Sequence, residues 1–270
     1  MNLASYGQSD DLRARKSQAH AETGAVVAQK VAFASDIALF LDVDGTLLDI
    51  ADHPSAVATP DGLVTALSRA RTKLGGAVAL VSGRPIDELD RLFSPLRLAA
   101  SGVHGAEMRL DPAEESRPVP QALQIPEALV AAVVGAARAI PGVFVEQKIY
   151  SLAVHYRAAP NAGRELRELL DRLIESEGDR RVEILEAHFA YELKMSGLDK
   201  GRAIAMFLES APFRGRAPVF IGDDTTDEAG FAAVAAHGGS AYSVGRLRPH
   251  ASGVFEDPQA VRAWLTDFAS

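Results

Sequence analysis

Residues 37–46 read IALFLDVDGT, an apolar run that ends in two aspartates one residue apart. An uninterrupted apolar run of this length is typical of a strand that is buried on both faces of a parallel sheet. Because alternate residues of a strand point to the same side, we expect Asp42 and Asp44 to lie close together. Two carboxylates that close repel each other unless a proton or a cation separates them. The stretch therefore predicts a buried strand that ends in a divalent-cation site, although solvated acids at a strand end would leave the same pattern.

Apolar runs alternate with helical patterns on both sides of this stretch. The runs at residues 77–82 and 217–222 predict further buried strands, and the periodic segments at 61–73 and 199–210 predict helices. The segment 257–268 predicts a closing amphipathic helix, whose Asp-Pro start supplies an N-cap and a first residue. The expected class is therefore α/β, with a doubly wound, mostly parallel sheet and right-handed crossovers.

A different pattern interrupts this alternation after a proline-rich stretch. Four segments there alternate apolar and polar residues: VFVEQKIY, SLAVHYR, VEILEA and FAYELKM. Such alternation is typical of an antiparallel sheet with one covered face and one open face. We therefore predict an inserted α+β domain at residues 113–195, a core made of 36–112 and 196–270, and an N-terminal extension at 1–35 that is partly helical or mobile.

The composition excludes several classes of function. The 270 residues include no cysteine, so disulfides and thiolate zinc sites are excluded and a reducing cytoplasm is the expected location. The seven histidines show no HxH or HExxH spacing, so no zinc site is expected. A net charge of −8 without a long Lys/Arg run argues against nucleic-acid binding. The absence of a long apolar run argues against a membrane span or a secretory signal. We expect a monomer that acts on a small molecule.

Four polar clusters stand at predicted strand ends or helix starts. They are DVDGT at 42–46, SGR at 82–84, DKG at 199–201 and GDDTTDE at 222–228. Ligands of open parallel sheets bind at the carboxyl ends of the strands, so the clusters are expected to share one crevice. Lys200 stands at a helix start, where the helix dipole disfavours a cation unless an anion faces it. Carboxylates, a cation, a hydroxyl group and a lysine together suit phosphoryl transfer to a carboxylate, although each cluster alone also fits turn or capping chemistry.

The order of these clusters resembles the haloacid dehalogenase (HAD) superfamily of phosphohydrolases, whose motifs are DxDGT, Ser/Thr, Lys and GDxxxD. The resemblance implies an HAD-like Rossmannoid core, and the inserted domain resembles the superfamily's larger α+β cap. Within the superfamily, the chain most resembles the trehalose-6-phosphate phosphatase family. Five longer stretches within residues 36–245 carry this more specific resemblance: LDVDGTL, SGVHGAEMR, EQKIYSLAVHYR, YELKMSGLDKG and IGDDTTDEAGF.

The resemblance implies catalytic roles for the core clusters. Asp42 would be the nucleophile, and Asp44 would protonate the departing sugar oxygen and then activate the hydrolytic water. Ser82 and Lys200 would bind the phosphoryl oxygens and offset the charge that develops during transfer. The phosphate-binding turn as a whole would consist of Ser82, Gly83 and Arg84.

The resemblance also implies a magnesium ion as the cofactor. The ion would be held by the Asp42 carboxylate, the backbone carbonyl of Asp44 and the Asp223 carboxylate. Either Asp224 or Asp227 would orient these ligands, and the sequence leaves the choice between the two open.

The inserted domain would then recognise the sugar. Two predicted strands each carry a pair of alternating polar side chains, which point to one face, and a solvated charged face is the alternative. The residues expected to bind substrate outside the phosphate turn are His104, Glu146, Lys148, His155, Arg157 and Glu192.

The activity that the resemblance implies is a Mg²⁺-dependent hydrolysis of trehalose 6-phosphate through an aspartyl-phosphate, as a step of trehalose biosynthesis. Another HAD sugar-phosphate phosphatase, of the sucrose-phosphate or mannosylphosphoglycerate type, is the alternative enzyme. A catalytically silent sugar-phosphate sensor is the alternative from another class. The complete set of nucleophile, acid, lysine and metal-binding aspartate argues against a sensor, because binding alone does not require both a nucleophile and an acid.

Overall fold

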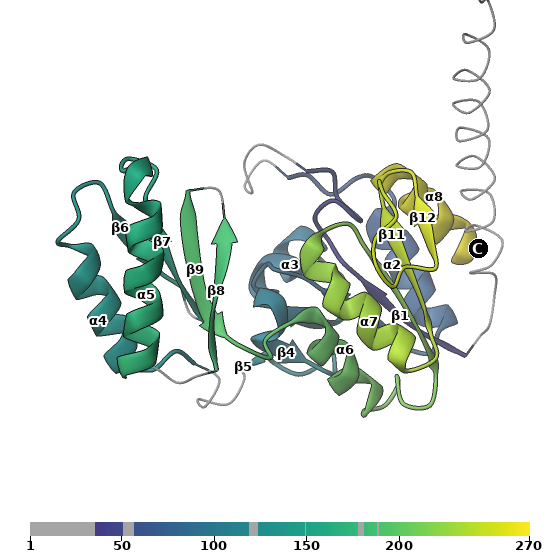
Figure 1. The fold of residues 1–270 in the computed structure, drawn as a ribbon. Coiled ribbons are helices and arrows are strands. Elements are labelled where there is room, and N and C mark those ends of the chain that lie inside the picture. Colours follow the sequence, from purple (N-terminus) through teal and green to yellow (C-terminus); the bar gives the residue numbers. More distant parts are fainter. Residues whose placement is uncertain (1–35, 51–56, 119–123, 149, 178–180, 188) are drawn as a thin grey trace, which may run out of the picture. The chain divides into compact units, whose positions relative to one another are not determined.

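The computed structural model describes residues 36–50, 57–118, 124–148, 150–177, 181–187 and 189–270. The core unit comprises Met1–Arg117 with Lys200–Ser270, and the inserted unit comprises Pro118–Asp199 (Figure 1). The predicted boundaries after residues 112 and 195 lie a few residues before these, and the predicted extension at 1–35 lies outside the described residues.

The core unit is built on an eight-stranded sheet in the order β12-β11-β10-β1-β2-β3-β4-β5 (Figure 1). Its strands are β1 (Ile37–Leu41), β2 (Val78–Val81), β3 (Ala99–Gly102), β4 (Glu107–Arg109), β5 (Arg117–Pro118), β10 (Ala217–Gly222), β11 (Ser240–Val244) and β12 (Gly253–Phe255). The strands from β12 to β3 pair in parallel, and β4 pairs antiparallel to β3. The predicted mostly parallel α/β sheet is therefore confirmed.

Strand β1 lies in the middle of this sheet because its residues are apolar on both faces. All five of its residues are buried, and it pairs with β10 on one side and β2 on the other. The Phe40 ring lies 5.5 Å from that of Phe213 and 5.7 Å from that of Phe207. This central position places the two aspartates that follow β1 at the middle of the sheet's carboxyl edge.

In the described residues of the core unit, five α-helices flank the sheet: α2 (Leu63–Lys73), α3 (Ile86–Leu92), α6 (Lys200–Leu208), α7 (Glu228–Ala236) and α8 (Pro258–Phe268). Helix α2 packs against α8, and α6 packs against α7. Helix α8 begins as predicted, because the Asp257 carboxylate accepts a hydrogen bond from the backbone N–H of Ala260 at 2.8 Å and Pro258 is the first helical residue. None of the helices in the described ranges has the length and apolar content that crossing a bilayer requires.

The inserted unit is a four-stranded antiparallel sheet with two helices. The sheet order is β6-β7-β9-β8, and the elements are α4 (Glu127–Ala137), β6 (Phe144–Gln147), β7 (Ser151–His155), α5 (Gly163–Glu177), β8 (Val182–Ala187) and β9 (Ala190–Met195). Helices α4 and α5 pack on each other and cover one face of the sheet (Figure 1). Leu152, Val154 and Leu193 are fully buried on that face. The alternating strands thus have the covered face that their pattern predicted, and polar residues that include Glu146, Ser151 and Glu192 lie on the other face.

Truncation of Phe40 tests the central position of β1. We expect Phe40→Ala to lower the free energy of unfolding by about 3–5 kcal/mol, because it removes a fully buried ring between Phe207 and Phe213. Leu247→Ala is the control, since that side chain is 64% exposed and its loss should change stability by less than about 0.5 kcal/mol. Urea unfolding followed by circular dichroism measures both values, and equal losses would contradict the placement of β1.

Candidate active site

Three of the predicted polar clusters meet at the carboxyl edge of the core sheet. Asp42 follows β1, Ser82 follows β2 and Asp223 follows β10. Since β1 pairs in parallel with both neighbours, the three turns leave the sheet side by side. The fourth cluster, at residues 199–201, lies at the start of α6, and its Lys200 side chain contacts Asp42 at the same edge.

Lys200 forms a buried ion-pair triad with two aspartates. Its Nζ lies 2.6 Å from Oδ1 of Asp42 and 2.5 Å from Oδ1 of Asp227, and all three residues are at most 3% exposed. These contacts explain why a lysine occupies the start of α6, where the helix dipole alone would disfavour it. The anionic partner that the sequence predicted is therefore confirmed, and there are two.

Burial and the charges within the triad together set the pKa values of its three members. Burial raises the pKa of Asp42 to about 6, although the charge of Lys200 acts in the opposite direction. Burial and the nearby charge of Asp42 raise the pKa of Asp227 to about 6 as well. Burial alone would lower the pKa of Lys200, but the charges of the two aspartates together raise it. Lys200 therefore remains a cation at neutral pH, and the carboxylates gain from any further positive charge.

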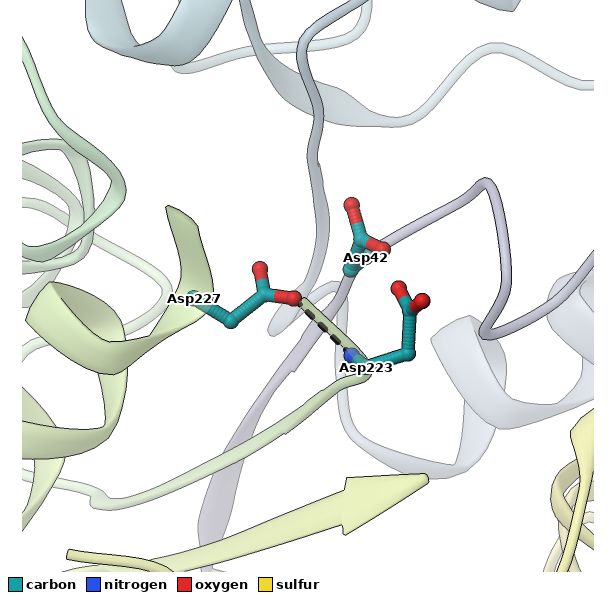
Figure 2. A group of neighbouring side chains, drawn as sticks. All are labelled: Asp42, Asp223 and Asp227. Atoms are coloured by element: carbon teal, nitrogen blue, oxygen red, sulfur yellow. Dashed lines mark hydrogen bonds between the residues drawn. The ribbon is translucent and has the colours of Figure 1, made fainter. Parts of the chain in front are cut away.

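Asp223 completes a cluster of three carboxylates. Asp42, Asp223 and Asp227 each place one oxygen so that the three atoms lie within 4.8 Å of one another, and Figure 2 shows the side chains around a common space. Burial also raises the pKa of Asp223. Three carboxylates face one ammonium group, which leaves an excess of two negative charges when all are ionised. Hard divalent cations prefer oxygen ligands, so this cluster is compatible with a divalent metal ion.

The structure separates the roles of Asp224 and Asp227. Oδ2 of Asp227 accepts a hydrogen bond from the backbone N–H of Asp223 at 2.9 Å (Figure 2). It accepts a second one from the backbone N–H of Asp224 at 2.8 Å. Its other oxygen faces Lys200, so Asp227 orients the loop and the lysine together. The Asp224 side chain is 61% exposed and points to Arg248 instead. Asp227 is therefore the residue that organises the cluster.

Asp44 has a cation of its own. Arg84 donates from Nε to Oδ2 of Asp44 at 2.6 Å and from Nη2 to Oδ1 at 2.7 Å, and its Nη1 lies 3.2 Å from Glu88. A bidentate pair of this kind is a strong charge-assisted interaction. Each of the two neighbouring carboxylates therefore has its own basic partner, Lys200 for Asp42 and Arg84 for Asp44, and the metal ion that the sequence argument placed between them stays a prediction. Arg84, which we expected in the phosphate turn, contacts Asp44.

The turn after β2 brings Ser82, Gly83 and His104 together. Oγ of Ser82 accepts a hydrogen bond from the backbone N–H of Arg84 at 3.1 Å, and the Ser82 carbonyl accepts one from the backbone N–H of His104 at 3.0 Å. A Cβ atom on Gly83 would lie 2.6 Å from Nε2 of His104, so the imidazole packs directly against this glycine. His104 has a φ of 51°, a left-handed conformation that few side chains adopt.

Most of the predicted sugar-binding residues gather on the open face of the inserted unit's sheet. Glu146 and Glu192 both stand opposite Ala153 in the strand register. Glu192 accepts from Oγ of Ser151 at 2.5 Å and lies 3.3 Å from Nζ of Lys148. Nε2 of His155 lies 2.9 Å from Oε2 of Glu146. The face therefore carries two carboxylates, each with a polar neighbour.

Arg157 does not share this face as the sequence predicted. Strand β7 ends at His155, and Arg157 is an exposed residue of the turn that follows. The backbone N–H of Tyr156 still donates to the carbonyl of Phe189 across the sheet. The Tyr156 carbonyl accepts a hydrogen bond from the backbone N–H of Ala159, which begins a turn, so the strand ends there. The alternation of the sequence continued past the end of the pairing.

The family model described as trehalose-phosphatase matches residues 40–257 of the chain. The chain is also 37% identical over 232 residues to the trehalose-6-phosphate phosphatase of Escherichia coli (strain K12), and the match covers 84% of this chain and 85% of that protein. The chain belongs to the trehalose-phosphatase family. Relatives that cover most of the chain are named phosphatases, so this member of the family is an enzyme that hydrolyses phosphate esters.

Solved structures agree with this assignment to the trehalose-phosphatase family. The trehalose-6-phosphate phosphatase of Aspergillus fumigatus superimposes with a TM-score of 0.71 at 25% identity, covering 90% of this chain and 94% of that one. A phosphatase of the haloalkanoate (HAD) enzyme superfamily from Bacteroides thetaiotaomicron superimposes with a TM-score of 0.61 at 15% identity, covering 86% and 94%. The second likeness concerns the fold alone, and it confirms the predicted HAD-like core.

Two residues near the cluster of this trehalose-phosphatase family member were not among the predicted site residues. Oγ1 of Thr46 lies 3.1 Å from Oδ2 of Asp42 and 3.5 Å from Oδ1 of Asp223. Its position in the DVDGT motif was the signal that could have identified it. Arg248 contacts the loop of Asp223, but no motif surrounds it in the sequence.

Gly45 tests how tightly the carboxylate cluster is packed. A Cβ atom at this position would lie 2.3 Å from Oδ2 of Asp223, so Gly45→Ala must displace that carboxylate. We expect at least a tenfold higher concentration of divalent metal ion for half-maximal phosphatase activity, on the order of other changes next to metal ligands. Gly215→Ala is the matched control, because Gly215 has a similar left-handed φ of 78° but nothing within 4 Å of the added atom. Equal dependence of the two variants on the concentration of the metal ion would contradict the packing argument.

Proposed function

We propose that this phosphatase hydrolyses trehalose 6-phosphate to trehalose and inorganic phosphate through a phosphorylated Asp42. The observation that carries the mechanism is the buried contact of Asp42 with Lys200 beside Asp223, at the end of the central strand. A buried carboxylate whose charge is held by a lysine and a cation can face a phosphate dianion without excessive repulsion. The family match supports the choice of substrate.

In the first step, a carboxylate oxygen of Asp42 attacks phosphorus, and the bond from phosphorus to the sugar oxygen breaks. Lys200 and Thr46 hold the Asp42 carboxylate through Oδ1 and Oδ2, which fixes the direction of its lone pairs. The leaving oxygen takes a proton from Asp44. In the second step, Asp44 accepts a proton from water, the water oxygen attacks phosphorus and the Asp42–phosphate bond breaks.

Arg84 controls when Asp44 can act as an acid. The bidentate pair with Arg84 occupies both carboxylate oxygens of Asp44, the group that accepts a proton from water in the second step. Donation of a proton to the sugar oxygen requires the pair to open, because a protonated carboxyl group no longer attracts both guanidinium N–H groups. A phosphate dianion offers Arg84 an alternative bidentate partner, so substrate binding and release of Asp44 would occur together.

The cofactor that we propose for the carboxylate cluster is Mg²⁺. Asp42, Asp223 and the backbone carbonyl of Asp44 would hold it, and Gly45 leaves the room that the Asp223 carboxylate needs. When bound, the ion supplies neutralisation and alignment of the phosphate. Ser82 presents a buried hydroxyl group at the same strand edge for a phosphoryl oxygen.

We further propose that the open face of the inserted unit recognises the sugar, and that this unit is the cap of the enzyme. Trehalose is uncharged and rich in hydroxyl groups, so it requires alternating hydrogen-bond acceptors and donors. The face supplies acceptors from Glu146 and Glu192 and donors from Lys148 and Ser151. Arg157 and His104 would add contacts from turns outside this sheet. We place the enzyme in the cytoplasm as a monomer that needs neither nucleic acid nor a membrane.

Asp42→Asn tests the nucleophile. An amide nitrogen or oxygen does not form the aspartyl-phosphate, so phosphate release from trehalose 6-phosphate should fall by at least about 10³-fold with Mg²⁺ present. Asp36→Asn is the matched control, since Asp36 is an exposed residue just before β1 and should retain wild-type activity. Colorimetric phosphate release measures the rate, and circular dichroism verifies the fold. A folded Asp42→Asn variant that keeps a tenth of the activity would rule out this role.

Glu192→Gln tests sugar recognition. Glu192 accepts from Ser151 and pairs with Lys148, so neutralising it should raise KM for trehalose 6-phosphate by at least about tenfold. Hydrolysis of a small aryl phosphate should be unchanged, because that substrate lacks the sugar. Glu186→Gln is the matched control, since Glu186 lies on the next strand but pairs with Arg167 of α5. An equal loss of activity on trehalose 6-phosphate and on the aryl phosphate would show that the open face does not bind the sugar.

A further inference from the structure

Arg248 is a buried arginine that the proposed mechanism does not use. It lies between β11 and β12, and its side chain is 7% exposed. Arginine is seldom buried in this way unless its guanidinium group has several fixed partners. Its partners here all belong to one segment, the loop 223–228, which carries Asp223 and leads into α7.

The guanidinium group of Arg248 contacts both ends of that loop. Its Nε donates to the backbone carbonyl of Asp223 at 2.6 Å, and its Nη2 lies 3.4 Å from Oδ1 of Asp224. Its Nη1 donates to Oγ1 of Thr225 at 3.1 Å and to Oε1 of Glu228 at 3.2 Å. The planar fork of an arginine can hold several acceptors in fixed directions, which a lysine cannot do.

Two opposite charges fix the backbone of Asp223. Its N–H donates to the carboxylate of Asp227 at 2.9 Å, and its carbonyl accepts from Arg248 at 2.6 Å. With the peptide groups on both sides of its Cα held, the side chain of Asp223 keeps its direction toward Asp42 and Thr46.

Arg248 also distributes charge within the loop. It pairs with Asp224 and Glu228, while Lys200 pairs with Asp227. Among the described residues, no basic side chain lies within ion-pair distance of Asp223. The loop thus neutralises its other acids and leaves the Asp223 carboxylate available for an added cation.

We propose that Arg248 is a positioning residue that sets the affinity of the carboxylate cluster for its divalent metal, by holding the Asp223 loop. The inference rests on the proposed function, because it assumes that Asp42 and Asp223 bind the ion. The side chain of Arg248 would act through the loop that it contacts and not as a ligand of the ion. Residues that orient metal ligands typically change metal affinity by 10–100-fold when they are replaced.

Isothermal titration calorimetry of the full-length, substrate-free protein with Mg²⁺ or Mn²⁺ provides the test. We expect Arg248→Gln to weaken binding by about 10–100-fold and Arg248→Lys to restore part of it, because lysine keeps the charge but loses the fork. Arg246→Gln is the matched control. Arg246 is an exposed arginine in the segment between β11 and β12 that also carries Arg248, and the variant should bind the metal like the wild type. The Mg²⁺ concentration for half-maximal activity should rise in parallel, while kcat at saturating Mg²⁺ changes by less than about threefold.

A folded Arg248→Gln variant with wild-type metal affinity overturns the inference, even if its melting temperature falls, because a purely structural role would leave the Kd for the metal unchanged. If Arg248→Gln does not fold, Arg248→Lys decides by the same criterion, and unchanged affinity again overturns the proposal. Failure of the wild-type protein to bind metal would overturn the proposed metal site. Wild-type binding with no effect of the variants would overturn the role of Arg248 alone.

Discussion

The buried ammonium group of Lys200 is the interaction on which the rest of the site depends. It joins the end of β1, the start of α6 and the loop after β10, three segments that lie far apart in the sequence. A buried cation of this kind is tolerated only when its partners are present, and loss of one partner typically costs about 3–5 kcal/mol. The ion pairs of Lys200 with Asp42 and Asp227 therefore hold the three segments together at the carboxyl edge of the sheet and fix the position of Asp42.

Three of the four aspartates at the site have a basic partner. Asp42 and Asp227 share Lys200, and Asp44 pairs with Arg84. Asp223 is held through its backbone instead, which leaves its carboxylate free to bind a cation. This arrangement concentrates the unbalanced negative charge at one point of the strand edge, where a divalent ion would neutralise it.

Much of the site could be predicted because parallel strands present their carboxyl ends at one edge. The sequence placed Asp42, Ser82 and Asp223 at such ends, and the helix-start position of Lys200 indicated an anionic partner. Local periodicity did not reveal where pairing stops, so Arg157 was placed on a strand that ends before it. Arg84 was predicted to bind phosphate because it follows Ser82 and Gly83 in the sequence. In the structure it pairs with Asp44, which lies 40 residues away in the chain.

The sequence by itself determined the α/β class, the buried strand that ends in Asp42, the order of the motifs and the family resemblance. These follow from local hydrophobic pattern and from residue types at fixed spacing, which do not depend on distant contacts. Only the tertiary structure decided which basic group pairs with which acid, that Asp227 rather than Asp224 orients the cluster, and that Arg248 holds the Asp223 loop. Ion pairs between residues distant in the chain depend on how strands and loops are placed in space, and no local pattern encodes that placement.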